Sequence, residues 1–250
     1  VTGLSCSALG EGLRLPVARD FIGSSDVFTP VPKGHIAPII DADGAVRKVP
    51  ALVCVDGEAF PALALAPFFQ LINSEEWEAE TIAGSGIFSP DYMVTLKSYP
   101  GLELPLDADG SMRISFLKSP SSFSKVSAID VLNGNFDPGQ LDNVIVLVGA
   151  TAFGLDDIVP TPYSGSSPGV ELQARMLSSI LDDQVPFSPS GTRLITGLFS
   201  VMLALACLYM ATRRGRHASI GLLVMTVSAP FLAISLHGVM LVSYGLWIGW

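Results

Sequence analysis

The run LITGLFSVMLALACLYMAT, residues 194–212, decides the architecture of this chain because it contains no charged side chain. A helix rises about 1.5 Å per residue, so a helix of this length spans a hydrocarbon core of about 30 Å. RRGRH follows at residues 213–217, and a second uncharged run extends over residues 218–236. Together the two runs predict a transmembrane hairpin, in which neighbouring helices accommodate Pro230.

A third apolar run begins at Val239 and is still apolar at Trp250, where we expect an incomplete third crossing over residues 239–250. Three crossings that begin outside the membrane would deliver the following segment to the cytoplasm, as a receptor requires. A buried hairpin in a soluble protein is the alternative, but soluble cores rarely contain two uncharged runs of this length.

The charges around the hairpin predict its orientation. Arg213, Arg214 and Arg216 lie in the connection between the first two runs, whereas the connection at residues 237–238 carries no Lys or Arg. The positive-inside rule places these three arginines in the cytoplasm. The residues that precede the hairpin are then outside the membrane.

The charges also divide the chain into two parts. All 23 acidic residues lie before Gly191, and Arg193 with the three loop arginines are the only charged side chains from there onward. The net charge is −9, and an acidic surface repels polyphosphate, so nucleic acid is not an expected partner. We expect an acidic domain over residues 1–190 and a membrane segment over residues 191–250.

The three cysteines predict neither a disulfide framework nor a metal site. Cys207 lies in the first apolar run, while Cys6 and Cys54 stand alone, without CxxC or Cys/His spacing around them. We therefore expect no structural metal and no cofactor.

The motif DADGAVR at residues 41–47 recurs as DADGSMR at residues 107–113, and an apolar run follows each copy. Asp-Gly pairs tolerate the backbone angles of tight turns, so we interpret both copies as strand-turn-strand units. A calcium loop is the alternative, but an EF-hand loop requires Gly at its sixth position and here Gly is the fourth. Because Arg47 and Arg113 recur, we hypothesise that they bind an anionic ligand; ordinary surface arginines are the alternative.

Further strand and helix signals surround the first repeat. Residues 34–55 predict two short strands that reverse at Asp43-Gly44. A second hairpin at the motif DGEAF leads into a helix over residues 61–73, which Pro67 either kinks or shifts toward a later start.

The run VIVLVG at residues 144–149 predicts the buried central strand of the domain. Gly149 and Gly154 invite a phosphate-loop interpretation, but that motif needs Lys and then Ser or Thr after its second glycine, and this chain has Leu155 and Asp156. The dinucleotide spacing is also absent, so we expect no nucleotide site.

GSSPG at residues 165–169 matches the GxSxG nucleophile pattern, which raises a membrane-anchored periplasmic hydrolase that uses Ser167 as an alternative function. In that pattern the residue after the serine donates its backbone N–H to the oxyanion, and Pro168 has none. A helix start fits better, with Ser167 as N-cap, Pro168 in the first turn and Glu171 near the positive end of the helix dipole.

The predicted helix after this motif has an apolar stripe formed by Val170, Ala174, Leu177 and Leu181. Only one histidine, His35, lies in the acidic domain, where we place it at a strand edge, so no Ser/His/Asp relay can be built. Asp156 and Asp157 are adjacent and point to opposite sides of an extended chain, which favours loop ion pairs over acid-base catalysis. We expect no catalytic residue in this chain.

Taken in order, GHIAPIIDADGAVRKVP, FPALAL, DADGSMRISF, IDVLNG, VIVLVGATAFGLDDIVPTP and SPGVELQARMLSSIL resemble the type-two CHASE family, the cyclase/histidine-kinase-associated sensory extracellular domains. The resemblance covers residues 34–183, and the apolar runs that follow match the family's layout. The leading transmembrane helix and early strands of the family are missing here, as is any effector, so we expect a truncated domain. The positions that match the family signature are Asp43, Gly44, Arg47, Gly149, Ala150, Thr151, Gly154, Leu155, Asp156, Thr161, Pro162, Pro168, Gly169, Val170 and Glu171.

The resemblance implies an α/β fold, a mixed-sheet extracytoplasmic sensor domain followed by a transmembrane helical segment. It implies a receptor in the bacterial inner membrane that regulates a cytoplasmic effector, with a nucleotide cyclase expected first and a diguanylate cyclase or histidine kinase next. Thr151, Asp156 and Thr161 join the two repeated arginines as candidate ligand-binding residues. The expected partners are the membrane, crossed several times, an extracytoplasmic ligand or protein, and a second copy in a homodimer. A non-catalytic envelope structural subunit is the remaining alternative.

Overall fold

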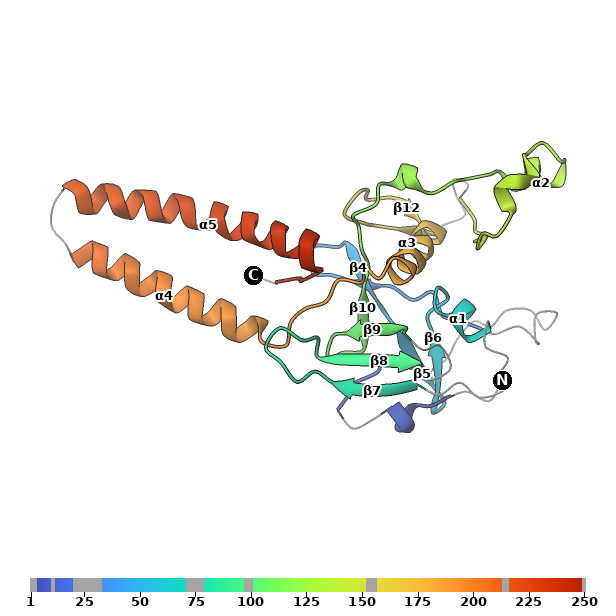
Figure 1. Cartoon of the computed structure of the whole chain (residues 1–250), viewed down its shortest axis with the longest axis horizontal. Coiled ribbons are helices and arrows are strands. Elements are labelled where there is room, and N and C mark those ends of the chain that lie inside the picture. The colour runs from blue at the N-terminus through green and yellow to red at the C-terminus, as the bar shows by residue number, and fades with distance from the viewer. Residues whose placement is uncertain are drawn as a thin grey trace.

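The structure is a computed structural model that describes residues 4–9, 12–19, 33–70, 79–96, 101–151, 157–212 and 216–248. It contains a β-rich domain from which two long helices extend side by side (Figure 1). This arrangement of a mixed α/β domain with two apolar helices confirms the predicted fold class.

The described part of the domain contains short strands, 3-10 turns and three helices. The strands are β1 (Leu4–Ser5), β2 (Val17–Ala18), β3 (Ile39–Ile40), β4 (Val46–Pro50), β5 (Leu52–Val55), β6 (Glu58–Pro61), β7 (Ala79–Ala83), β8 (Tyr92–Leu96), β9 (Glu103–Leu106), β10 (Ser111–Arg113), β11 (Ile158–Val159) and β12 (Ser167–Pro168). The domain helices are α1 (Ala66–Gln70), α2 (Ala128–Leu132) and α3 (Gly169–Leu181), with 3-10 turns η1 (Cys6–Leu9), η3 (Pro120–Ser122) and η4 (Pro138–Leu141). The strands form sheets in the orders β1-β6-β5-β2, β10-β4-β3, β7-β8-β9 and β11-β12.

The two DADG repeats lie next to each other because β4 and β10 pair antiparallel. Gly44 and Gly110 have φ angles of 85° and 73°, which glycine adopts without steric cost. Each of these glycines donates its N–H to the carbonyl of the first aspartate of its repeat, Asp41 or Asp107, at 2.9 Å. The predicted turns and their flanking strands are confirmed.

The hairpin predicted at DGEAF is also present, as β5 and β6 pair antiparallel. Asp56 and Gly57 at its turn have φ angles of 52° and 86°, the two positive angles of a tight β-hairpin turn. The helix that follows begins at Ala66 and not at Pro61, because Pro61 ends β6. Pro67 therefore stands in the first turn of α1, where a missing N–H costs nothing.

One core unites the sheets with α1 and α3. Its largest fully buried apolar side chains are Leu65, Leu106, Met112, Leu172 and Met176. The stripe predicted for α3 is therefore wrong except at Leu177, and Leu181 is 56% exposed. The predicted stripe differs from the buried face because α3 also buries polar side chains, whose contacts are described below.

The start of α3 differs by one residue from the prediction. Pro168 occupies the cap position and Gly169 is the first helical residue, so Ser167 belongs to β12 and makes no capping hydrogen bond. Glu171 lies in the first turn, as predicted.

The predicted central strand over residues 144–149 is wrong. These residues carry no strand assignment, and the structure describes no strand that pairs with them. Val148 is 88% exposed, although its neighbour Leu147 packs against the core. An apolar β-branched run becomes a buried strand only where neighbouring strands pair with it, and composition alone does not supply those neighbours.

The two long helices are α4 (Thr192–Thr212) and α5 (Arg216–Tyr244), and both are long and apolar enough to cross a membrane. Their apolar side chains are exposed, and α4 has no buried residue, which distinguishes it from the core helix of a soluble protein. The predicted boundary at residues 237–238 is wrong, because α5 continues through it to Tyr244. The chain then turns at Gly245, where φ is 66°.

Cys6 and Cys54 form a disulfide with a Cα–Cα distance of 6.1 Å, so the expectation that they stand alone is wrong. Strand order explains the pairing: β1, which precedes Cys6, and β5, which contains Cys54, both pair with β6. Disulfides persist in oxidising compartments, so this bond agrees with a domain outside the cytoplasm.

We predict that Cys6→Ala lowers the free energy of unfolding by about 2 to 4 kcal/mol, because the bond closes a loop across a sequence separation of 48 residues. Urea unfolding of the purified chain in detergent, with and without dithiothreitol, measures this effect. Wild type should lose stability in the reductant while Cys6→Ala does not change further, and Cys207→Ala should retain the wild-type response. A wild-type midpoint that ignores the reductant would contradict the prediction.

We also predict a pH-dependent stability that arises from His35. Burial lowers the pKa of this imidazole from 6.5 to about 4, so folding favours the neutral form. The stabilisation is complete above pH 6.5 and is lost as the pH falls toward 4, by about 3 kcal/mol. The difference in unfolding free energy between wild type and His35→Gln, measured at pH 7 and at pH 4, should change by this amount. Equal acid sensitivity in both proteins would exclude His35 as the cause.

Candidate functional site: a cavity between the domain and the membrane hairpin

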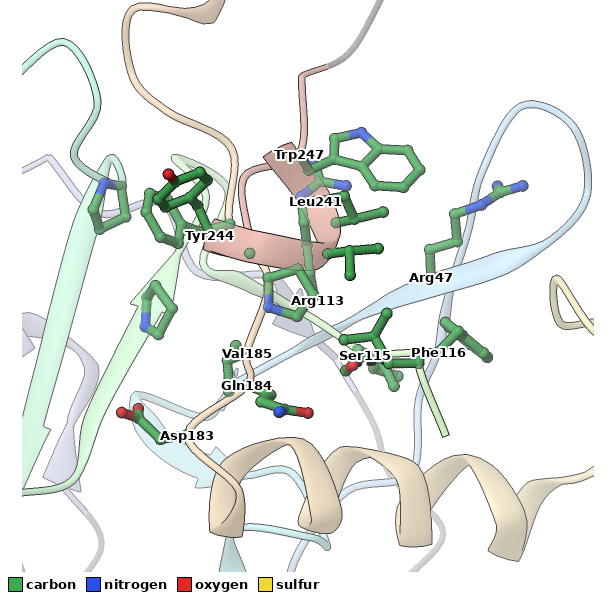
Figure 2. Close-up of a pocket in the computed structure, with 18 of the residues that line it drawn as sticks. Arg47, Arg113, Ser115, Phe116, Asp183, Gln184, Val185, Leu241, Tyr244 and Trp247 are labelled. Atoms are coloured by element: carbon green, nitrogen blue, oxygen red, sulfur yellow. Dashed lines mark hydrogen bonds between the residues drawn. The ribbon is translucent and has the colours of Figure 1, made fainter. Parts of the chain in front are cut away.

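A cavity of about 630 Å³ lies between the β-rich domain and the C-terminal end of α5 (Figure 2). One wall comes from β4, β8, β9, β10 and the residues that follow β10. The opposite wall comes from residues 241–245 and 247, and residues 183–187, which link α3 to α4, complete the lining. Small-molecule sites commonly have volumes of 300 to 1,000 Å³ and lie at junctions between structural units.

The lining is mostly apolar with a few charged groups. Its apolar members include Met93, Pro105, Phe116, Leu241, Val242 and Trp247. Its charged members are Arg47, Glu103, Arg113 and Asp183. Such a surface suits a ligand that is largely apolar and is oriented by a small number of polar contacts.

Arg113 lies at the centre of the cavity's polar contacts. Its side chain is 15% exposed, and one Nη donates a hydrogen bond to Asp107 at 2.8 Å. The guanidinium carbon lies 5.3 Å from the centre of the Trp247 ring, within the range of a cation–π interaction. Its Nε is buried and has no acceptor among the described residues. Burial raises the pKa of Asp107, and the charge of Arg113 opposes this rise.

Arg47 occupies the corresponding position of the first repeat but has a different environment. It binds Asp41 at 3.0 Å and Asp43 at 2.6 Å, and its side chain points away from Trp247 (Figure 2). The hydrogen bond from Arg47 is the main reason that the pKa of Asp43 falls to about 2. Arg47 thus has two carboxylate partners where Arg113 has one.

The first helix of the hairpin is attached to the loop between β7 and β8. The N–H of Gly191 donates to the carbonyl of Ile87 at 3.0 Å, and the hydroxyl of Ser190 donates to the carbonyl of Gly86 at 2.9 Å. A Cβ at Gly191 would lie 2.2 Å from the Ile87 side chain, so only glycine allows this approach. The start of α4 is therefore fixed to the domain.

The end of α5 is attached to the segment that enters α4. The N–H of Phe187 donates to the carbonyl of Gly245 at 2.9 Å, and the N–H of Trp247 donates to the carbonyl of Phe187 at 2.8 Å. The chain entering the hairpin is thus bonded directly to the chain leaving it.

The two helices differ in length. α4 contains 21 residues and α5 contains 29, which makes α5 longer by about 12 Å at helical rise. The last two turns of α5 continue past the start of α4 toward the domain (Figure 1). These turns carry Leu241, Val242 and Tyr244, which line the cavity.

A buried ion pair holds the domain wall of the cavity. Arg175 on α3 is only 1% exposed and binds Glu171 through two nitrogens at 3.0 and 3.2 Å. A third nitrogen donates to the carbonyl of Lys118 at 2.7 Å. The rings of Phe116, Phe123 and Tyr163 surround the guanidinium at 4.9 to 5.5 Å. This contact fixes Phe116, a lining residue, to α3.

The five predicted ligand-binding residues separate into three groups. Arg47 and Arg113 both line the cavity, as described above. Thr151 is exposed, and Thr161 is buried with its hydroxyl 2.9 Å from that of Ser167; neither belongs to the lining. Asp156 lies outside the described residues.

Two glycines of the family signature have packing roles. A Cβ at Gly149 would lie 2.4 Å from Val170, and a Cβ at Gly169 would lie 2.3 Å from Asp157. Residues 152–156, which contain Gly154 and Leu155 of the signature, lie outside the described residues. In the described part of the signature, residues 149 and 157 thus pack against the start of α3.

The geometry of Ser167 suits a structural residue. It is 5% exposed, and its described side-chain partner is the hydroxyl of Thr161, which is not a base. Among the residues that the structure describes, no group of three or more His, Cys, Asp or Glu side chains is placed to hold a metal ion.

Sequence reasoning missed the aromatic side of the cavity. Trp247 and Tyr244 lie at the end of an apolar run, and Trp and Tyr are enriched at membrane interfaces, so their position carried a usable signal. Phe116 carried no such sequence signal, because its position in the cavity depends on its contact with Arg175 in the folded domain.

A family model described as the CHASE2 domain matches residues 15–211 of this chain. Neither the curated proteins nor the solved structures give a match. The match includes the segment over which the sequence resembles type-two CHASE domains, and it confirms that resemblance.

We predict that Gly191→Val lowers the free energy of unfolding by about 1 to 3 kcal/mol, because the new side chain collides with Ile87. Hydrogen exchange in the loop over residues 84–91 should accelerate at the same time. Gly197→Val is the matched control on α4, since a Cβ there meets nothing within 4 Å. Equal exchange of the loop in both variants would show that α4 is not fixed at this point.

Proposed function

Because this chain belongs to the CHASE2 family, whose domain is an extracellular sensory domain of receptors such as cyclases and kinases, we propose that it senses a ligand and regulates a cytoplasmic effector. The ligand acts outside the inner membrane of a bacterium, on the domain over residues 1–190. α4 and α5 carry the response across the membrane.

The position of the cavity is the observation that carries this proposal. A ligand there contacts the domain on one side and the last turns of α5 on the other. A ligand changes a conformational equilibrium only if it binds the two conformations with different affinity. A site between two elements provides such a difference whenever their separation differs between the two states.

The orientation of the hairpin supports a sensory domain outside the cytoplasm. The loop arginines Arg213, Arg214 and Arg216 favour the cytoplasmic side, and the Cys6–Cys54 disulfide favours an oxidising compartment. Phe187 and Trp247 are bonded on the domain side, so two crossings return the chain to its starting side. A cytoplasmic effector therefore requires a further crossing C-terminal to Trp247.

Among effectors we propose a nucleotide cyclase first and a diguanylate cyclase or histidine kinase next. Signalling through membrane helices commonly uses symmetric pairs, so we propose that the receptor is a homodimer. The buried position of Ser167 gives no support to a hydrolase.

We predict that Phe187→Pro in the full-length receptor changes the basal rate of its effector about 5-fold or more, the lower range of allosteric coupling. Proline removes the N–H that donates to Gly245 and so loosens the end of α5. Ser188→Pro is the control, because no backbone acceptor for its N–H is found among the described residues. The effector rate in native membranes measures the response.

Two results would contradict the proposed function. An effector rate that is equal in Phe187→Pro, Ser188→Pro and wild type would show that the hairpin does not couple to it. A gene that encodes no effector after Trp250 would favour a structural subunit of the cell envelope.

A further inference from the structure

We propose that the cavity binds an amphiphile whose oxyanion head group is held by Arg113 and whose apolar chain packs between the domain and α5. This inference rests on the proposed sensory role of the same cavity and specifies the ligand class. It follows from three features: the repeats differ in their ion pairs, the lining is apolar, and the cavity lies at the membrane surface.

The two repeats differ in the partner of their second aspartate. Asp43 of the first repeat corresponds to Asp109 of the second. Asp43 binds the arginine of its own repeat at 2.6 Å, whereas Asp109 binds Lys48, the residue that follows the first repeat, at 2.8 Å. Among the described residues, Arg113 therefore keeps only Asp107 as a carboxylate partner.

A guanidinium carries five N–H donors, and a carboxylate or phosphate accepts two of them at once. The buried Nε of Arg113 has no acceptor in the described part of the chain, and a buried donor without a partner is costly. Because Arg113 lines the cavity, an oxyanion there accepts from its guanidinium, and a turn of the guanidinium toward the ligand brings the buried Nε within reach. The lining contains two carboxylates. Asp183 lies on the side away from Trp247 and Arg113 (Figure 2), and Glu103 is the exposed first residue of β9.

The remainder of the lining selects an apolar body. Met93, Pro105 and Phe116 on the domain side face Leu241 and Val242 on α5 across the cavity. A small hydrated anion would leave these side chains without a partner, whereas an alkyl chain removes them from water.

The cavity lies close to the membrane surface if α4 and α5 span the membrane, because its α5 wall belongs to the end of that helix that continues past the start of α4 (Figure 1). Trp247 and Tyr244, the residue types of the interfacial belt, stand at this edge. Two sources share the proposed chemistry, an anionic membrane lipid and a free alkyl phosphate or carboxylate.

The test uses the purified chain in phosphatidylcholine nanodiscs, with Trp77→Phe and Trp250→Phe, so that Trp247 reports binding by fluorescence. Decyl phosphate is the probe, and decanol is the uncharged control. We expect saturable binding of decyl phosphate, weakened about 10-fold or more by Arg113→Gln. Arg47→Gln, the matched variant of the other repeat, should weaken it less than about 3-fold, because Arg47 is occupied by two carboxylates.

A second variant separates a lost site from a misfolded one. Val242→Phe fills the apolar part of the cavity, leaves Arg113 in place and adds no tryptophan, so it should also abolish saturable binding. Retention of the Cys6–Cys54 disulfide and of the thermal midpoint shows that a variant is folded. Equal binding of decyl phosphate and decanol, or equal affinity in wild type and Arg113→Gln, would overturn the inference.

Nanodiscs that contain phosphatidylglycerol distinguish the two sources. If a membrane lipid is the ligand, these nanodiscs should compete with decyl phosphate in a manner that depends on Arg113; if the ligand is a free amphiphile, they should not compete. Both results support the site. If decyl phosphate binds without changing the effector rate, the sensory role is contradicted but the binding site is not. If decyl phosphate does not bind and Phe187→Pro still changes the effector rate, the ligand class is contradicted but the sensory role is not.

Discussion

The backbone bonds of Phe187 impose the constraint on which the remaining structure depends. The N–H of Phe187 donates to the carbonyl of Gly245, and its carbonyl accepts from the N–H of Trp247. The segment that enters the helical hairpin is therefore hydrogen-bonded to the segment that leaves it. The start of α4 and the end of α5 therefore both lie beside the domain. Because α5 is the longer helix, its end extends past the start of α4 toward the domain. Its last turns become a wall of the cavity for this reason.

The two walls of the cavity differ in how firmly they are held. Arg175 fixes Phe116 through an ion pair, a carbonyl contact and three surrounding rings, and removal of one partner from a buried pair is strongly destabilising. The α5 wall is held by the Phe187 bridge and by the stacking of Trp247 on Arg113. A molecule that enters the cavity therefore contacts one wall held by a buried ion pair and one wall formed by the end of α5, which is held by fewer described polar contacts.

Local signals in the sequence predicted local structure well. Asp-Gly pairs predicted the turns at Gly44 and Gly57, and uncharged runs predicted two long apolar helices, because each of these features is determined by adjacent residues; the third crossing predicted over residues 239–250 is wrong, since residues 239–244 continue α5. The disulfide, the absent strand pairing at residues 144–149 and the buried face of α3 depend on residues far apart in the sequence. The repeated arginines predicted one side of the site, but the aromatic side required the fold.

The two repeats form the same turn but differ in how the charge of their arginine is neutralised. Both copies place an arginine six residues after an aspartate and bond the two. In the antiparallel register of β4 and β10, Lys48 lies directly opposite Arg113, and two cations in such a cross-strand pair repel each other. Asp107 and Asp109 offset this repulsion, but Asp109 is drawn to Lys48 and leaves Arg113 with one carboxylate. The pairing that brings the repeats together is thus also what leaves a partly satisfied arginine at the cavity, while its counterpart Arg47 is neutralised within its own turn.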